Sequence, residues 1–349
     1  MALSAVIAFT QASSIGNPFE FFEPQVTLTS DERTRIERGE AIVKALPAMP
    51  QEVAIFSAAR ADFSGERLIA WVRRIDLLKK SAYVPAVARF SDPPRIEDLA
   101  GLELDQADLE ELRSCRPGSC GLKLSEPEIG ELGEVASARR PGWQDAVQQS
   151  FRRVVLARAQ AYRQGGLSAA QPYRDRGEPV ALAAEFEQIL SHSPFLGQRM
   201  PKLVQFLGRY PLEESRDFES FLYWSKEVLG GRPIISITHV VIARHDNAPL
   251  PEAVVASRQV FATHYVTGSL AITTVAGGRD GMPRHLAYLN RSRVDLLDGF
   301  FGGLVRRVAE RRLRNEAGQV VDGLRKRLAE GDPTGNRQES ATPEPTRID

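Results

Sequence analysis

The segment that most constrains the fold runs from residue 232 to 291, where strand-like stretches alternate with short, turn-rich loops. Ile234–Arg244 is rich in β-branched residues and largely alternates apolar with polar ones, which is typical of a β-strand. Three more strands are predicted at Ala253–Tyr265, Ser269–Ala276 and Arg284–Arg291. Because strands that follow one another through short loops usually pair antiparallel, this region predicts an antiparallel meander.

A long amphipathic helix is predicted after the meander, over residues 294–314. Its apolar residues recur every three or four positions from Val294 to Leu313 and would form one continuous face. The opposite face is basic and includes Arg306, Arg307, Arg311 and Arg312. This basic face predicts either a transient contact with anionic lipid headgroups or an ordinary solvated surface.

The residues before the meander predict further strands and a block of helices. Glu52–Ala59 and Tyr83–Phe90 indicate strands, and a helix carrying the apolar residues of Leu68–Leu78 lies between them. From about residue 125 to 230 the pattern is helical throughout, with breaks at proline and glycine. The helices predicted outside Leu68–Leu78 span residues 30–46, 141–162, 181–190, 201–209 and 218–229.

The order of these elements resembles the START-like helix-grip (SRPBCC) superfamily. The resemblance implies an α+β fold in which a curved antiparallel sheet grips the long C-terminal helix, with a cavity between them. The block 125–230 would then be an all-helical insertion. The segments that carry the resemblance are Val53–Ala59, Leu68–Leu78, Tyr83–Phe90, Ile234–Arg244, Val254–Tyr265, Leu270–Ala276, Leu286–Asn290 and Val294–Arg314.

Three shorter stretches are similar to an uncharacterised bacterial family with no known activity: Leu112–Leu124, Phe221–Lys226 and Tyr288–Arg293. Helix-grip proteins often bind lipids, sterols or polyketides, and some are cyclases, hydrolases or dehydratases. They share no catalytic motif, so the resemblance assigns no site residue, and function has to be argued from the site itself.

The expected organisation has five segments. They are a signal-like or disordered N-terminus at 1–29, the first part of the START-like domain at 30–124, the helical insertion at 125–230, the meander with its helix at 231–330, and a disordered tail at 331–349. The N-terminus has a short apolar stretch and small residues up to Ala12, which fits the second half of a signal peptide as well as a short strand. We therefore expect a periplasmic or secreted protein, and otherwise a cytoplasmic one.

Charge and motif content exclude several classes of protein. Lys and Arg together number 45, and Asp and Glu also number 45, so the basic excess of a general nucleic-acid binder is missing. Neither a nucleophile elbow nor a phosphate-binding glycine motif is present. No metal site and no cofactor are predicted.

The two cysteines flank a predicted tight turn. Pro117-Gly118 suits the central positions of a type II turn and would bring Cys115 and Cys120 within disulfide distance. A disulfide would fit an exported protein. Two free thiols and a redox-active pair remain alternatives.

His239 and His264 are the candidate catalytic bases, because a histidine in a cavity can serve in general acid–base chemistry. Antiparallel pairing of their strands would place them far apart. Each can equally be a hydrogen-bonded histidine of the sheet.

The candidate ligand-binding residues gather around the meander and the helical elements. In a strand, Tyr288 and Asn290 share one face while Arg291 and Arg293 share the other. The same positions also fit a sheet end with surface ion pairs, or core aromatic residues. The full set of candidates is Arg258, Tyr265, Tyr288, Asn290, Phe301, Tyr223 and Trp224.

Three functions are compatible with these sequence features. The favoured one is binding or transport of a hydrophobic small molecule, a lipid above all, between the sheet and the helix 294–314. The first alternative is a structural or interaction protein with a collapsed cavity, which uses the helical insertion as its docking surface. The second is a cyclase- or hydrolase-type enzyme on the same fold.

Overall fold

The computed structural model describes residues 17–333 without 139, 212–216, 229–230, 246–249, 279–281, 298–317, 319–320 and 332. The strands are β1 (Ile42–Ala45), β2 (Glu52–Ala61), β3 (Ala86–Arg89), β4 (Glu219–Glu227), β5 (Ile234–Arg244), β6 (Ala253–Ala262), β7 (Val266–Ala276) and β8 (Arg284–Val294). The α-helices are α1 (Ser30–Glu37), α2 (Gly65–Arg73), α3 (Ile75–Lys79), α4 (Gln106–Leu112), α5 (Glu126–Ser137), α6 (Trp143–Gly165), α7 (Leu182–Ser191), α8 (Pro194–Arg199) and α9 (Pro201–Arg209). The short 3₁₀ segments are η1 (Glu20–Phe22), η2 (Ile96–Leu99), η3 (Gly166–Ala169) and η6 (Asp295–Leu297).

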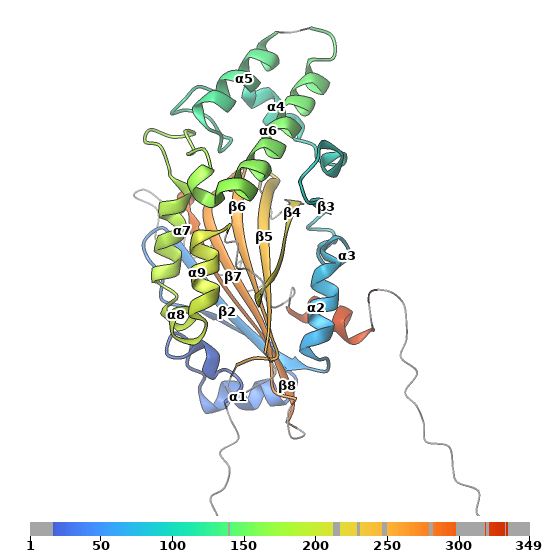
Figure 1. Ribbon diagram of the computed structural model, residues 1–349, viewed down its shortest axis with the longest axis vertical. Coiled ribbons are helices and arrows are strands. Elements are labelled where there is room, and N and C mark those ends of the chain that lie inside the picture. Colours follow the sequence, from blue (N-terminus) through green and yellow to red (C-terminus); the bar gives the residue numbers. More distant parts are fainter. Residues whose placement is uncertain are drawn as a thin grey trace, which may run out of the picture.

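The fold is α+β and centres on one curved, open sheet (Figure 1). The eight strands lie in the order β1-β2-β8-β7-β6-β5-β4-β3, and every neighbouring pair is antiparallel. The strands β5 to β8 follow one another in space as they do in sequence, so the predicted meander is confirmed. β2 pairs with β8 at the edge of this meander, with Glu52 opposite Arg293.

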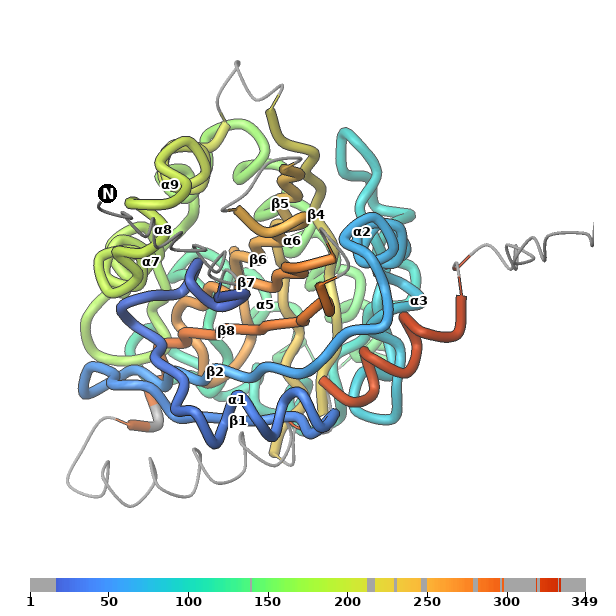
Figure 2. Tube along the Cα trace, turned by 90° about the horizontal axis from the view of Figure 1, so that it is seen from below, coloured from blue at the N-terminus to red at the C-terminus, as the bar shows by residue number. Residues whose placement is uncertain are grey.

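Helices cover both faces of this sheet. The first face packs against α6 to α9 in one large core, and α7 to α9 lie together on one side of the strands in Figures 1 and 2. The second face packs against α2, α3 and the helical residues 321–329 in a smaller core that includes Val321 and Leu328. The predicted helices at 141–162, 181–190 and 201–209 are α6, α7 and α9.

One predicted helix of the insertion is a strand. Residues 218–229 contain β4 instead, which pairs with both β3 and β5. Leu222 and Trp224 pack into the core of the first face, and Phe221 and Tyr223 into that of the second. A strand buried on both faces is apolar without interruption and has no alternating pattern, so periodicity alone could not separate it from a helix. The block 125–230 is therefore not all-helical.

The helix predicted at 30–46 ends early. Thr29 caps α1 in a capping box with Glu32, and Gly39, with φ of +88°, follows the helix end. The β-branched pair Ile42 and Val43 then starts β1.

Residues 17–29, part of the segment expected to be signal-like or disordered, also have a fixed place. Phe22 is fully buried and packs edge-on against Phe56 of β2. These aromatic side chains bury enough surface to hold the segment on the sheet.

Some of the predicted features fall where the structure describes little or nothing. The helix predicted at 294–314 begins instead as the end of β8 and η6, and its remainder lies outside the described residues. Phe301, Arg306, Arg307, Arg311 and Arg312 lie there too. Residues 1–16 and nearly all of the expected tail, 331–349, also lie outside the described residues.

Candidate ligand-binding pocket

A pocket of about 300 Å³ lies at one end of the sheet. Four strand ends meet there: the start of β5, the turn between β6 and β7, and the end of β8. The segment from α4 to Lys123 and the residues around Asp175 form its outer wall. The lining residues are Glu111, Cys120, Gly121, Lys123, Asp175, Arg176, Arg232, His264, Tyr265 and Asp295.

The predicted disulfide Cys115–Cys120 is present, with 4.5 Å between the two Cα atoms, and its Cys120 forms part of this wall. Gly118 takes φ of +84°, as the third position of a type II turn requires. Cys115 is buried, whereas Cys120 is partly exposed and also lines an adjoining pocket. The Cys120 backbone N–H donates to the Asp175 carbonyl at 2.9 Å, so the disulfide loop is fixed to the opposite wall.

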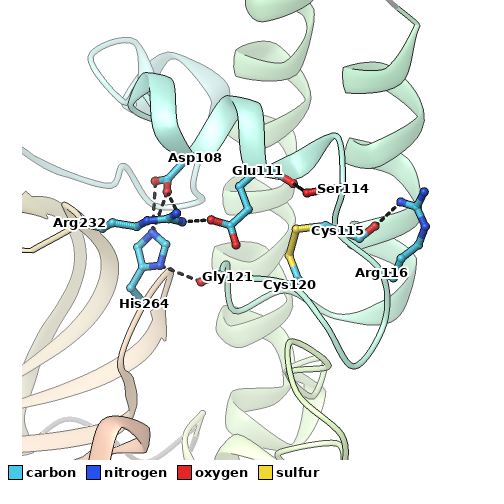
Figure 3. Close-up of a disulfide and its surroundings, with 9 residues drawn as sticks. All are labelled: Asp108, Glu111, Ser114, Cys115, Arg116, Cys120, Gly121, Arg232 and His264. Carbon is cyan, nitrogen blue, oxygen red and sulfur yellow. Dashed lines mark hydrogen bonds and ion pairs between the residues drawn. A yellow bond between two sulfur atoms is a disulfide. The ribbon is translucent and has the colours of Figure 1, made fainter.

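His264 joins the sheet end to α4 (Figure 3). Its Nδ1 lies 2.9 Å from the Gly121 carbonyl oxygen, and its Nε2 lies 3.1 Å from Asp108 Oδ1. Both partners are acceptors, so both bonds form together when the ring carries two N–H groups. Neither nitrogen is then left to accept a proton from a substrate.

Arg232 lies beside this pair, where the chain enters β5. Its Nη1 is 3.5 Å from Asp108 Oδ1 and also pairs closely with the Glu111 carboxylate. A Cβ at position 121 would collide with that carboxylate, so Gly121 leaves room for Glu111 against the disulfide loop. One guanidinium thus holds α4 against the sheet end.

A buried network of charges forms the floor of the pocket. Lys123 Nζ lies 2.6 Å from Asp295 Oδ2 and 3.4 Å from Asp175 Oδ2, and its side chain is only 2% exposed. Arg176, half exposed, approaches Asp295 Oδ2 at 3.5 Å. The other oxygen, Asp295 Oδ1, is buried and has no hydrogen-bond partner in the described part of the chain.

Tyr265, in the turn between β6 and β7, has an uncommon backbone conformation. Its φ is +61°, and no other non-glycine residue of the described chain has a positive φ. A bulky residue adopts this conformation only at a cost of about 1–2 kcal/mol. Its carbonyl accepts the Asp295 N–H at 3.0 Å, and its hydroxyl accepts the Arg232 backbone N–H at 3.2 Å. The strained turn therefore joins the ends of β5 and β8.

His239, the other candidate base, lies away from the pocket, on the first face of the sheet. Its Nδ1 is 2.8 Å from the Tyr162 hydroxyl, and its ring lies 4.3 Å from that of Tyr210. Burial, together with nearby Arg163, lowers the pKa of His239 to about 3. A neutral, enclosed imidazole fits the expectation of a hydrogen-bonded sheet histidine.

Two more of the predicted ligand residues are also core residues of the first face. Arg258 donates to the Tyr162 hydroxyl and to the Leu207 carbonyl, and burial lowers its pKa to about 9. Trp224 donates to the Asp98 carbonyl at 2.8 Å.

Tyr223, Tyr288 and Asn290 face the other way. Tyr223 and Tyr288 pack in the core of the second face, and the Tyr223 hydroxyl accepts a hydrogen bond from Lys79 at 3.3 Å. Ser292 donates to Asn290 at 2.7 Å, as the alternation of β8 predicts. Burial raises the pKa of Tyr288 to about 12.

The structure thus brings together His264, Tyr265 and Cys120 of the sequence-predicted site residues. Sequence reasoning missed their charged partners, above all Arg232, Lys123 and Asp295. Arg232 stands just before the first strand of the predicted meander, whereas Asp295 falls inside the helix predicted at 294–314. The signal that could have found them was the meander itself, which places the start of its first strand and the end of its last at the same end of the sheet.

Neither a family model nor any curated protein matches this chain. Within the described ranges, no group of three or more acidic, histidine or cysteine side chains has the proximity of a metal site. None of the helices described combines the length and the apolar character that a membrane crossing requires.

Proposed function

We propose that this chain binds a small polar molecule in the pocket at the sheet end. The observation that carries the proposal is the composition of the wall: Glu111, Lys123, Asp175, Arg176, Arg232 and Asp295 carry formal charge among its ten lining residues. An apolar ligand would remove water from these charged groups and offer no hydrogen bonds in its place, which costs free energy. A volume of about 300 Å³ is at the lower end of small-molecule sites, roughly 300–1,000 Å³, so the ligand is of metabolite size.

Binding rather than catalysis is the activity we infer. His264 contacts the pocket, but the protein itself provides acceptors for both of its ring nitrogens. His239 keeps a free Nε2, but its side chain is buried among aromatic rings. A general base needs hydrogen-bond reach to its substrate, and neither histidine offers this in the arrangement described.

The hydrophobic-ligand hypothesis and the START-like relationship remain predictions. Both need the helix expected at 294–314, most of which lies outside the described residues. One observation favours a second site there: Tyr223, Tyr288 and Asn290 share the second face of the sheet, which that helix would cover. The predicted membrane contact through Arg306 and its neighbours depends on the same segment.

A docking role for the insertion has less support. The exposed large apolar side chains of the described residues are Met49, Leu77, Tyr83 and Ile96. None lies within 125–230, where such a role would need an apolar patch. The disulfide fits an oxidising compartment, and we propose a periplasmic or secreted location on that basis.

A thermal-shift screen of small polar metabolites, followed by calorimetric titration of each hit, tests the proposed function. Saturating ligand at 100 times its Kd should stabilise the fold by about 2.7 kcal/mol. Arg232→Gln removes the guanidinium at the pocket and should abolish the shift. Arg35→Gln, an exposed arginine paired with Glu40, should behave as wild type. If no polar compound stabilises the wild-type protein, the proposal is wrong.

A further inference from the structure

One acceptor of the pocket has no hydrogen-bond partner among the described residues. Asp295 is 9% exposed and lines the pocket. Its Oδ2 takes the contacts to Lys123 and Arg176, whereas Oδ1 is buried with no hydrogen-bond partner. A buried carboxylate oxygen without a donor is costly. The Lys123 contact to Asp295 is made at Oδ2, so a ligand donor at Oδ1 would complete the site.

The Tyr265 hydroxyl also offers a donor to the pocket. The Tyr265 hydroxyl accepts the Arg232 backbone N–H at 3.2 Å, which leaves its own O–H proton for another partner. The guanidinium of Arg232, whose side chain is 39% exposed, stands at the same wall. An acceptor that carries negative charge suits this corner, because hydrogen bonds to charged groups are the stronger ones.

The charges of the wall balance. Lys123, Arg176 and Arg232 oppose Glu111, Asp175 and Asp295. A ligand with a net charge would leave that charge uncompensated in a confined site. The ligand should therefore be neutral overall while it carries a donor at one end and an acceptor at the other.

We infer, building on the proposed polar-ligand function, that the pocket takes a small amino-carboxylate. Its ammonium group donates to Asp295 Oδ1, and its carboxylate accepts from the Tyr265 hydroxyl beside Arg232. The strained turn at Tyr265 holds these two ends together, because the Tyr265 carbonyl binds the Asp295 N–H at 3.0 Å. A neutral sugar could contact Asp295 Oδ1 and the Tyr265 hydroxyl through its own hydroxyl groups, and binding of a sugar is therefore the competing outcome.

Calorimetric titration of the full, disulfide-bonded chain with free amino acids tests this inference. For the amino acid that binds most tightly, the N-acetyl derivative lacks the ammonium charge and the amide lacks the carboxylate. Each derivative should bind at least tenfold more weakly than the parent. Glucose and other neutral sugars of similar size should not bind.

Two variants assign the contacts. Tyr265→Phe keeps the ring and removes the O–H, and we expect at least a fivefold loss of affinity for the parent amino acid. Its penalty should be smaller for the amide derivative, whose carbonyl oxygen still accepts a hydrogen bond but carries no negative charge. Tyr83→Phe, at a tyrosine that is 55% exposed, is the matched control and should bind as wild type. Asp295→Asn should remove the preference for the free ammonium over the N-acetyl form.

The ways in which these experiments can fail are distinguishable. Tight binding of a sugar, or of N-acetyl and free amino acids alike, overturns the amino-carboxylate inference while the polar-ligand function stands. Absence of binding by every polar compound tested overturns both. Unchanged affinity in a folded Tyr265→Phe variant shows that the carboxylate does not meet this hydroxyl.

Discussion

His239 lies directly opposite Arg258 in the register of β5 and β6, and the Tyr162 hydroxyl contacts both side chains. The guanidinium donates to that hydroxyl oxygen, so the hydroxyl proton points to His239 Nδ1. The imidazole proton then sits on Nε2, which has no partner. One tyrosine of α6 thus fixes the tautomer of a buried histidine and stabilises a buried cation.

The stability of the fold should decrease in acid because of His239. Burial keeps the folded-state pKa at about 3, whereas the unfolded chain takes up a proton below about pH 6.5. The stabilising contribution is therefore complete above about pH 6.5 and is lost as the pH falls toward 3. Urea unfolding at several pH values should show a His239 contribution of about 1.4 kcal/mol per pH unit in that window.

The variant His239→Gln isolates this contribution. It removes the titrating ring, so the difference in unfolding free energy between the variant and the wild type should shrink as the pH decreases from 6.5 to 4. A difference that stays constant with pH would contradict the assignment of a neutral, buried imidazole.

Arg258 and Tyr162 should respond in opposite ways to substitution. Tyr162→Phe leaves a buried guanidinium and His239 Nδ1 each short of one partner, and should cost about 1–3 kcal/mol. Arg258→Met keeps an aliphatic side chain at this position and removes the buried charge that lies over the Phe186 ring, so it should change stability by less than about 1 kcal/mol or increase it. Chemical unfolding at pH 7 compares the two, and an equal loss in both would show that the guanidinium itself stabilises the core.

Reduction of the disulfide should loosen the wall of the pocket. The bond closes a short loop with a sequence separation of 5, and a loop of this size contributes about 2 kcal/mol in the chain-entropy model. Dithiothreitol should lower the unfolding free energy of the wild type by about that amount. The double variant Cys115→Ser with Cys120→Ser should be equally destabilised and insensitive to the reductant; a reductant effect in this variant would point to a different cause.

The sequence was sufficient for the elements whose residue types are distinctive or whose turns are explicit. The meander from Ile234 onward was predicted because its strands are rich in β-branched residues and are separated by turn-rich loops, and the long helix α6 because its apolar residues follow a helical period. The disulfide was predicted because Pro117-Gly118 can form only a few turn types. In these cases local chemistry and the global fold agree.

Tertiary burial explains the main errors. β4 is covered on both faces, so Phe221 to Trp224 carry no alternation that a sequence could show. The pocket was missed for a related reason: Lys123, Asp175 and Asp295 are remote in sequence and meet only when the ends of the sheet and the disulfide loop come together. Isolated charges of this kind look like ordinary surface residues until the topology is known.

Substitution of Lys123 should lower the unfolding free energy more than substitution of most other charged residues. Its Nζ is the ammonium that lies 2.6 Å from Asp295 Oδ2 and 3.4 Å from Asp175 Oδ2. Lys123→Met keeps the size of the side chain but leaves two buried carboxylates without their ammonium partner, and the expected loss at pH 7 is about 3–5 kcal/mol.

Chemical unfolding at pH 7 measures this effect. Lys202→Met is the matched control, since the Lys202 side chain is 79% exposed and its partner Asp217 is 56% exposed; we expect no measurable change there. If Lys123→Met is as stable as the control at pH 7, the carboxylates of Asp175 and Asp295 are not buried in the way the structure describes, and the unpartnered Asp295 oxygen loses its meaning as a ligand contact.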